Sequence, residues 1–381
     1  MTQETKDVLN ANRCTYAEII GDYVPRKNDE NVCVCFCSSN EYAPILSVAM
    51  ASLLSNVSPS HFYDIVVLTC DMSADNMSRL SKLVVGKPFC SLRFMNINKL
   101  VAGLSFYTWA HFTAFTYYRL IIPDLFKEYD KVLYLDSDIV VNADVSELYN
   151  VVLDEEHWLA AAIDTHVAGR MSNDNGYAGE EGKYFKDLGL EEGEYFQAGV
   201  MLINIKRFLS AFQSRELVEG ASKTNYRWLD QDYLNVLCHG KVKFISNRWN
   251  VMILNTPSRI DENHMRDDYY DSYIDARANP YIIHYVGRSI PCFNPTADMY
   301  QFFWEYARIT PYYELLLALV VKEAENRAVN RMQKEFEKYR NERLSFSLKR
   351  KVIDPIVNIF FPKGTIRRDR VRNAWWKFIG K

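Results

Sequence analysis

The chain has 381 residues, of which 48% are hydrophobic and 24% are charged. This composition is typical of a globular protein with a sizeable core, and it favours one large α/β domain with an appendage over two equal domains. The net charge of −3 gives no overall bias toward nucleic acid, so nucleic-acid binding is excluded as a leading function. The charge is uneven, however, because residues 349–381 carry a net +8, which leaves −11 for the rest.

The start of the chain and its cysteines indicate the compartment. Residues 1–12 are polar, and no stretch is long and apolar enough for a membrane span, so we expect neither a signal peptide nor a spanning helix. None of the eight cysteines forms a CxxC pair. Cys33, Cys35 and Cys37 alternate within one predicted strand, which is typical of small buried hydrophobic residues rather than metal ligands or disulfides. A reducing cytoplasm is therefore expected.

The first third of the chain alternates strand and helix patterns. Apolar runs predict strands over 31–37, 62–70, 92–97 and 131–135. Helices are predicted over 44–55, from Ser73 to 85, and over 113–127, where Pro123 interrupts the pattern. Strands separated by helices favour a parallel, doubly wound sheet. Residues 38–42 lack the glycine-rich fingerprint of a nicotinamide- or flavin-binding domain, which argues against that class.

The rest of the chain changes character twice. Further strands are expected over 158–163, 197–205 and 241–246. The polar, glycine-rich segment 169–193 predicts a loop over a site. Residues 297–343 have a helical pattern, whereas 346–381 mixes apolar runs with clustered basic residues.

The tripeptide Asp136-Ser137-Asp138 is the most informative feature of the chain. It follows the apolar run 132–135, at the edge where open α/β sheets bind ligands. Side chains two residues apart in an extended chain point the same way, so both carboxylates are placed to share one hard cation. A solvated turn is the alternative interpretation, because Asp and Ser are ordinary turn residues. The tripeptide alone does not decide between the two.

Three further segments carry candidate site residues. Arg119 precedes the acidic strand and suits a phosphate or carboxylate partner, although a plain surface arginine is the alternative. Asp164 ends the strand 158–163, where it would cap a helix or accept hydrogen bonds from ligand hydroxyls. Small residues directly after Gln197 permit close approach of the backbone to a ligand, or tight internal packing.

Two polar segments follow later in the chain. Asp230 is predicted as the N-cap of an amphipathic helix and Asp232 as a complement to its dipole, which leaves Gln231 between them unexplained. His284 ends another apolar strand, and a lone histidine is more often a core residue than a ligand. Two carboxylates and one histidine would suit Mn²⁺, which accepts both oxygen and imidazole nitrogen.

In this order the motifs resemble glycosyltransferase family 8, the GT-A-fold group that includes glycogenin and bacterial lipopolysaccharide α-galactosyl- and α-glucosyltransferases. The resemblance extends from about Asn31 to Cys292. Five segments carry it: Thr116-Tyr-Tyr-Arg-Leu120, Val132-Leu-Tyr-Leu-Asp-Ser-Asp138, Ala198-Gly-Val-Met-Leu-Ile-Asn204, Asp230-Gln-Asp232 and His284-Tyr-Val-Gly287. It implies an α/β fold of the GT-A type, a Rossmann-like mixed sheet flanked by helices, here with a helical, basic C-terminal extension.

The resemblance also implies an activity. A hexose, galactose or glucose, would pass with retention of configuration from a UDP-sugar to a glycan or glycolipid acceptor, in bacterial lipopolysaccharide or capsular polysaccharide synthesis. Asp136, Asp138 and His284 would hold Mn²⁺, with Mg²⁺ as the alternative. The implied donor-binding positions are Ser39, Tyr42, Arg119, Asp136, Ser137, Gln197, Ala198, Gly287 and Arg288.

Three implied catalytic positions complete the set: Gln231, Asp230 and Asp164. Gln231 would lie beneath the anomeric carbon, and the two aspartates would hold sugar hydroxyls. An amide oxygen is a poor nucleophile, so we favour same-face transfer through a short-lived, oxocarbenium-like ion pair that the Gln231 carbonyl oxygen stabilises.

The sequence departs from the family at three places. Ser39 lies near a position where aspartate commonly contacts the nucleobase, and Gln197 replaces an asparagine that touches the sugar. Ile290-Pro291-Cys292 replaces the Lys-Pro-Trp of the family, so the lysine that binds the diphosphate in the family is missing. Arg288 is the candidate substitute for this lysine. These changes motivate an alternative hypothesis, an inactive nucleotide-sugar-binding scaffold. A nucleotidyltransferase is a second alternative, but its glycine-rich, basic first loop is missing here.

The predicted organisation has four parts: a polar lead-in (1–30), a GT-A catalytic domain (31–296), a helical extension (297–345) and a basic aromatic tail (346–381). Basic clusters, Trp375 and Trp376 in the tail suit an anionic membrane surface. A helix packed on the acidic catalytic domain, or a nucleic-acid contact, is the alternative. The expected location is therefore cytoplasmic, peripheral on the inner face of the cell membrane.

Overall fold

The computed structural model describes residues 15–18, 31–101, 114–171, 182–191, 193–212, 214–254 and 266–348. The chain divides into two compact units, Met1–Val320 and Val321–Lys381. Both sheets and every candidate site residue belong to the first unit. The predicted domain boundaries remain predictions.

An eight-stranded sheet forms the centre of the first unit. Its strands in spatial order are β1 (Thr15–Glu18), β4 (Cys90–Asn96), β3 (Phe62–Thr69), β2 (Asn31–Cys37), β5 (Lys131–Leu135), β8 (Phe196–Asn204), β7 (Leu159–Ile163) and β9 (Val242–Ile245). The five strands from β1 to β5 are parallel, as their alternation with helices predicts. β8 runs antiparallel to both β5 and β7. The sheet is therefore mixed, which confirms the implied fold class; the parallel arrangement predicted from the first third of the chain holds for those strands and ends at β8.

A second sheet has three strands, one of which directly follows the acidic tripeptide in sequence. It consists of β10 (Val251–Ile253), β11 (Ile282–Tyr285) and β6 (Ile139–Val141), in that order. β6 begins directly after Asp138, and β11 pairs antiparallel with it, so that His284 is opposite Ile139. This pairing brings a segment from late in the chain to the end of β5.

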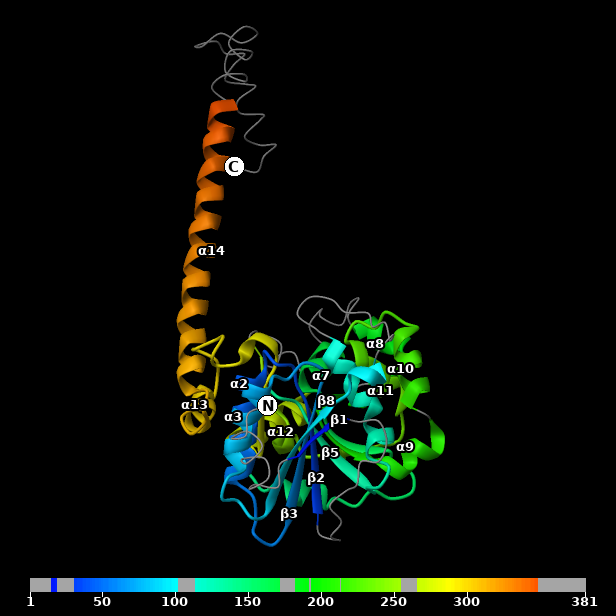
Figure 1. Cartoon of the computed structure of the whole chain (residues 1–381). Helices are drawn as coiled ribbons and strands as arrows, with labels where there is room; N and C mark the ends of the chain where they lie inside the picture. Colours follow the sequence, from blue (N-terminus) through cyan, green and yellow to red (C-terminus); the bar gives the residue numbers. More distant parts are fainter. Residues whose placement is uncertain are drawn as a thin grey trace, which may run out of the picture. The chain divides into compact units, whose positions relative to one another are not determined.

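Helices cover both sides of the central sheet, with α2 and α3 on one side and α9, α10 and α11 on the other (Figure 1). The described helices of the first half are α2 (Ala43–Ser55), α3 (Ala74–Ser81), α4 (Asn98–Val101), α5 (Ile122–Leu125), α6 (Val145–Tyr149) and α7 (Thr165–Met171). Those of the second half are α8 (Lys183–Asp187), α9 (Ile205–Ala211), α10 (Ser214–Ser222), α11 (Leu229–Leu237), α12 (Asp267–Ala278), α13 (Tyr300–Ala307) and α14 (Tyr313–Leu348). Short 3₁₀ helices are η1 (Lys82–Val84), η2 (Ala114–Ile121), η4 (Asn247–Trp249) and η6 (Gly287–Ser289).

Local signals explain several helix ends and correct others. Ser73 caps α3 by accepting from the Asn76 N–H, as expected. The helix predicted over 113–127 is instead η2 followed by α5, with Pro123 in the first turn of α5, where its missing N–H is tolerated. The loop predicted over 169–193 is partly helical, because α7 runs to Met171 and α8 lies within it. Residues 172–181 of that segment lie outside the described part.

The core forms where the apolar strand runs meet the helices. Cys33 and Cys35 are fully buried and Cys37 is half-buried, and seven cysteines of the described residues are free thiols, which confirms their interpretation as small core residues. β1 was not foreseen within the polar lead-in; it pairs with β4 at the sheet edge, where backbone hydrogen bonds rather than an apolar pattern define the strand.

Residues 321–340 of α14 are exposed or half-buried, and the predicted tail beyond residue 348 lies outside the described residues. Within the described part of the chain, no helix combines the length and apolarity that crossing a membrane requires.

Candidate metal and donor-sugar site

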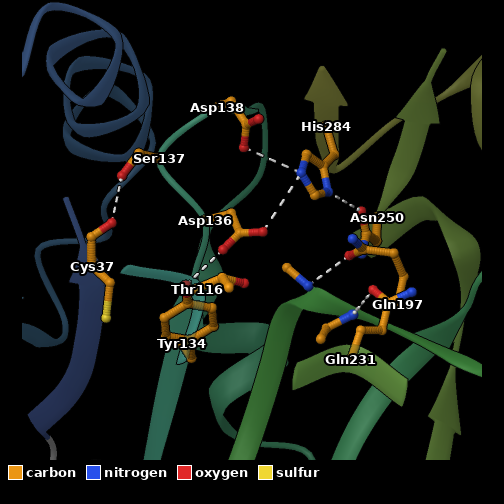
Figure 2. Close-up of polar contacts among 12 residues, drawn as sticks. Cys37, Thr116, Tyr134, Asp136, Ser137, Asp138, Gln197, Gln231, Asn250 and His284 are labelled. Atoms are coloured by element: carbon orange, nitrogen blue, oxygen red, sulfur yellow. Dashed lines mark hydrogen bonds and ion pairs between the residues drawn. The ribbon is translucent and has the colours of Figure 1, made fainter. Parts of the chain in front are cut away.

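The acidic tripeptide and His284 meet at the end of β5. The Nε2 atom of His284 lies 3.2 Å from Oδ1 of Asp138 and 3.8 Å from Oδ2 of Asp136. One ligand atom from each of the three residues can be chosen so that all lie within 4.8 Å of one another. Figure 2 shows both carboxylates directed toward the same nitrogen of the His284 imidazole. The strand pairing of β6 with β11 thus brings together residues almost 150 positions apart.

Backbone hydrogen bonds hold the tripeptide in place. The Asp136 N–H donates to the carbonyl of Gly199 at 2.8 Å, and the Tyr285 N–H donates to the carbonyl of Asp138 at 2.9 Å. The Ser137 hydroxyl donates to the Cys37 carbonyl at 3.1 Å, which ties the turn to the end of β2. Ser137 therefore has a structural partner, and its predicted contact with the donor remains a prediction.

Gly199 makes room for this cluster. A Cβ atom at this position would lie 2.6 Å from Oδ2 of Asp136 and 2.8 Å from Oε1 of Gln197, and would also collide with the His284 ring. The contacts at Gly199 are the tight internal packing that the sequence offered as the alternative, and close approach of a ligand to this backbone remains a prediction.

The three residues fit a divalent cation. Two carboxylate oxygens and an imidazole nitrogen are a donor set that Mn²⁺ accepts, and ligand atoms of one ion lie roughly 3–5 Å apart. No second group of this kind occurs among the residues that the structure describes. Burial lowers the pKa of His284, but the carboxylates of Asp138 and Asp136 outweigh burial and raise it. A cation bound at Nε2 would take the place of the proton that these carboxylates attract.

Arg119 connects the metal cluster to the second half of the site. Its Nη2 donates to Oδ1 of Asp136 at 3.1 Å, and its Nε lies 2.9 Å from Oδ2 of Asp230. Its Nη1 donates to the carbonyl of Ala198, and its guanidinium stacks 4.6 Å from the ring centre of Tyr134. Burial lowers the pKa of Arg119, and the two aspartates reverse this and raise it, so the side chain stays charged. Arg119 is 7% exposed, so the surface-arginine interpretation was wrong.

A buried network orients Gln231. Its Nε2 donates to Oδ2 of Asp164 at 2.9 Å and to the hydroxyl of Tyr195 at 3.3 Å. Its Oε1 accepts the Ala198 N–H at 3.0 Å. These partners leave one lone pair of the amide oxygen for a further contact. Tyr195 in turn donates to Asp232 at 2.6 Å.

The two candidate catalytic aspartates are buried and carry raised pKa values. Burial raises the pKa of Asp164 to about 6, against hydrogen bonds from the Val167 N–H and Gln231. Burial also raises the pKa of Asp230 to about 6, with Arg119 partly offsetting it. The expected helix cap at Asp164 is confirmed, because it accepts from the first turn of α7, whereas its contact with ligand hydroxyls remains a prediction.

The predicted helix cap at Asp230 was wrong. α11 begins after Trp228, and the Asp230 side chain accepts from the Thr116 hydroxyl and pairs with Arg119 instead. Leu229, just before it, has a φ of 52°, a backbone conformation that residues with a Cβ rarely adopt. Such strain persists only where surrounding contacts enforce it, and it occurs often at functional sites.

The remaining predicted residues flank the cluster. Tyr42 is partly exposed at the start of α2, and its pKa is raised by burial and by the nearby Asp138. The Ser39 hydroxyl accepts the Tyr42 N–H at 3.3 Å and so belongs to the same turn. Gly287 has a φ of 62°, which favours glycine at the turn into η6. Arg288 is exposed on η6, whereas Ile290 at the lost lysine position is fully buried.

Three residues of the site were missed by sequence reasoning. Tyr134 donates its hydroxyl to Asp136 at 2.6 Å, Tyr195 supports Gln231, and Asn250 accepts from the His284 ring at 3.1 Å. Tyr134 lies within a quoted motif, and its position two residues before Asp136 on β5 was a usable signal. Nothing in the sequence around Asn250 indicates its contact.

Comparison with known proteins is consistent with this arrangement. A family profile described as glycosyl transferase family 8 matches residues 33–291. A putative glycosyltransferase of Haemophilus influenzae is 30% identical over 227 residues, which are 57% of this chain and 62% of that protein. The lipopolysaccharide 1,3-galactosyltransferase of Salmonella typhimurium is 27% identical over 48% of this chain and 50% of its own length. The chain thus spans about half to two thirds of these relatives.

Two solved structures share the fold. The apo structure of the bifunctional glycosyltransferase WbbM is 32% identical, with a TM-score of 0.69 over 79% of this chain and 54% of that one. The galactosyltransferase LgtC, solved with donor and acceptor sugar analogues, is 27% identical, with a TM-score of 0.58 over 74% of this chain and 96% of that one. The central mixed sheet flanked by helices is accordingly of the GT-A type. Because the family profile covers more than half of the sequence, this chain belongs to glycosyltransferase family 8.

Proposed function

We propose that this protein transfers a hexose, galactose or glucose, from a UDP-sugar to a glycan or glycolipid acceptor with retention of configuration. The observation that carries the proposal is the convergence of Asp136, Asp138 and His284 beside Arg119 and Gln231. A cation site next to an oriented amide and two buried acids suits a donor with a diphosphate on one side and a sugar on the other.

Mn²⁺, or alternatively Mg²⁺, would be held by Asp136, Asp138 and His284. When bound, the cation would neutralise charge that develops on the departing diphosphate. Arg119 would add positive charge nearby, but several of its donors are already committed to Asp136, Asp230 and the protein backbone. Its proposed role is therefore to hold both aspartates in position and to supply charge.

The proposed transfer breaks the bond between the anomeric carbon and the phosphate oxygen and forms a bond from that carbon to an acceptor hydroxyl oxygen. The hydroxyl proton passes to the departing phosphate oxygen on the same face of the sugar. Positive charge on the anomeric carbon would be stabilised by the remaining lone pair of the Gln231 carbonyl oxygen. Asp164 and Tyr195 hold this amide, so the oxygen needs no reorganisation during the reaction.

The remaining predicted residues would bind the donor at its edges. Asp164 and Asp230 would accept hydrogen bonds from sugar hydroxyls, with Gln197 and Ala198 beside them. Tyr42 would stack near the uracil, with Ser39 in the same turn. Arg288 would replace the diphosphate contact of the lost lysine, supported by its exposure on η6 directly after Gly287.

The proposed setting is bacterial lipopolysaccharide or capsular polysaccharide synthesis on the cytoplasmic face of the membrane. The name of the Salmonella relative supports a glycolipid acceptor. The tail 346–381 would supply membrane contact through its basic and aromatic residues. No nucleic-acid partner is proposed.

Donor turnover tests the proposal directly. UDP release is measured with a panel of nucleotide sugars, with and without Mn²⁺, and we expect release from UDP-galactose or UDP-glucose that requires the metal. Donor binding without turnover under any condition would instead establish the inactive scaffold. Formation of a nucleotide sugar from a sugar phosphate and a nucleoside triphosphate would establish a nucleotidyltransferase.

Removal of residues 346–381 tests the membrane proposal separately. We expect the truncated protein to lose sedimentation with anionic phospholipid vesicles while keeping full transfer to a soluble acceptor. Each nearby basic residue contributes about 1 kcal/mol of attraction to such a surface. Vesicle binding that survives truncation would contradict the proposed role. Loss of solubility or folding on truncation would instead favour a tail packed on the catalytic domain.

A further inference from the structure

The two nitrogens of the buried His284 ring face different partners. Nε2 faces the carboxylates of Asp138 and Asp136, whereas Nδ1 lies 3.1 Å from Oδ1 of Asn250 (Figure 2). A neutral imidazole donates from one nitrogen and accepts at the other. If Nδ1 carries the hydrogen, the lone pair of Nε2 points at the candidate cation position. Which nitrogen is protonated therefore decides whether His284 is a ligand.

The orientation of Asn250 follows from its second partner. Its Nδ2 donates to Oε1 of Gln197 at 2.6 Å, and the same oxygen accepts the Gly199 N–H at 2.6 Å. A backbone N–H can only donate, so the Gln197 atom beside it is the carbonyl oxygen. That oxygen requires the amide NH₂ of Asn250 on its side, which leaves the Asn250 oxygen facing Nδ1.

One backbone group thus sets the donor and the acceptor in each of these three consecutive hydrogen bonds. These bonds run from the Gly199 N–H through Gln197 and Asn250 to the ring of His284. Asn250 and His284 are 1% and 2% exposed, so water does not compete readily for these atoms. Asn250 lies between η4 and β10, and β10 is paired in parallel with β11, so the contact joins neighbouring strands.

We propose that Asn250 is a positioning residue that holds His284 with Nδ1 protonated and Nε2 open to a divalent cation, and that Gln197 locks the Asn250 amide in the required orientation. This inference rests on the proposed cation site. It also assigns Gln197 a role beyond contact with the donor sugar: its carbonyl oxygen is committed to Gly199 and Asn250. Hydrogen-bond partners of metal-bound histidines commonly act in this way.

The test measures Mn²⁺ affinity of the full chain by isothermal titration calorimetry and by electron paramagnetic resonance of free Mn²⁺, without donor. We expect Asn250→Ala to weaken Mn²⁺ binding about 10–100-fold, the usual effect of removing such a partner. Gln197→Met, which keeps the length of the side chain but removes the acceptor, should weaken Mn²⁺ binding about 10-fold, the lower end of the same range. Gln197→Glu, whose carboxylate can accept both hydrogen bonds, should bind Mn²⁺ no more weakly than wild type.

The tautomer provides a readout that general loss of stability would not change. In ¹⁵N spectra of histidine-labelled protein at saturating diamagnetic Mg²⁺, wild-type His284 should carry its hydrogen on Nδ1. The His284 signals are identified by their absence from His284→Gln. Asn250→Ala and Gln197→Met should shift the population toward the Nε2-protonated form.

A matched control separates this role from ordinary core packing. Asn235 is as buried as Asn250, and its side chain bonds to the backbone of Phe196 and Gln231, away from His284. Asn235→Ala should lower the melting temperature but leave Mn²⁺ affinity unchanged. Wild-type affinity and an Nδ1-protonated ring in Asn250→Ala would overturn the inference. If that variant does not fold, the same results in Gln197→Met would overturn it.

The outcome also distinguishes this inference from the proposed cation site. Asp138→Asn removes a candidate ligand and should abolish Mn²⁺ binding whatever Asn250 does. If Asp138→Asn loses Mn²⁺ binding and Asn250→Ala keeps it, only the positioning role of Asn250 is refuted. Absence of Mn²⁺ binding in wild type would refute the cation site and this inference together.

Discussion

The cation side of the site, formed by Asp136, Asp138 and His284, differs from the amide side around Gln231 in how its charges are compensated. On the cation side, two carboxylates converge on one histidine, and Arg119 reaches only Asp136 among the three. On the amide side, Gln231 already has partners for both its nitrogen and its oxygen.

This difference indicates how each side would work. The cation side gathers negative charge that a divalent ion would neutralise, so its function depends on loading. The amide side is assembled before any ligand arrives, so its function depends on rigid orientation. Substitutions on the two sides should therefore separate into effects on metal affinity and effects on turnover.

The largest expected effect comes from Asp138→Asn. The substitution removes a charged ligand while keeping the size of the side chain, so we expect the rate of UDP release to fall roughly 100-fold or more, with the fold intact. UDP release and circular dichroism check this result. Retention of more than a few per cent of activity would count heavily against the cation assignment.

Gln231→Ala should lower the turnover rate almost as much, by roughly 100-fold, because it removes the group that we propose stabilises charge on the reacting carbon. Mn²⁺ affinity should stay within about twofold of wild type, since Gln231 contacts none of the three candidate ligands in the described hydrogen bonds. Steady-state kinetics and calorimetry separate the two quantities. A parallel loss of Mn²⁺ binding would show that the two sides are not independent.

Gly199→Ala tests the position where the backbone of β8 lies against Asp136 and His284. Its Cβ would displace Asp136, Gln197 or the His284 ring, so we expect Mn²⁺ affinity to fall about 10-fold and unfolding free energy to fall by about 1–3 kcal/mol. Gly189→Ala is the control, because its Cβ would meet nothing within 4 Å while its φ of 76° still imposes backbone strain. An equal loss of Mn²⁺ affinity in both variants would rule out the steric explanation.

The last prediction concerns the pH dependence of stability on the amide side. Burial raises the pKa of Asp164 from 3.8 to about 6, so the folded protein binds a proton more tightly than the unfolded chain does. The contribution of Asp164 to stability is therefore greatest below pH 3.8 and falls as pH rises to about 6. Between pH 3.8 and about 6, the unfolding free energy of wild type should fall by up to about 3 kcal/mol relative to that of Asp164→Asn. Above pH 6 the difference between the two proteins should stay constant. Denaturant unfolding of both proteins at a series of pH values measures the difference, and a constant difference would contradict the raised pKa.

Much of the site was predictable because its residues stand at the ends of apolar runs. Asp136, Asp138 and Asp164 follow parallel strands of the central sheet, whose ends meet at one edge. His284 lies one residue before the end of β11 and reaches them through the pairing of β11 with β6. The same reasoning failed at Asp230, where a side chain at a helix start was assumed to cap the helix. A buried arginine from η2 competes for that carboxylate, and local sequence does not reveal such a partner.

The direction of β8 was also beyond sequence reasoning. A buried apolar run reads the same for a parallel and an antiparallel strand, and only the path of the connecting chain decides between them. The antiparallel direction matters for the candidate site, because it brings Gln197 and Ala198 to the same edge as Asp136.

By itself, the sequence determined that an α/β protein with acids at its strand ends would form, and the order of its motifs pointed to glycosyltransferase family 8. Only the tertiary structure decided which polar atoms face one another. Asn250 contacts a histidine 34 residues away, and Gln231 contacts an aspartate 67 residues away. Hydrogen bonds depend on distances of about 3 Å and on donor direction, which strand order and packing set and which residue type and spacing leave open.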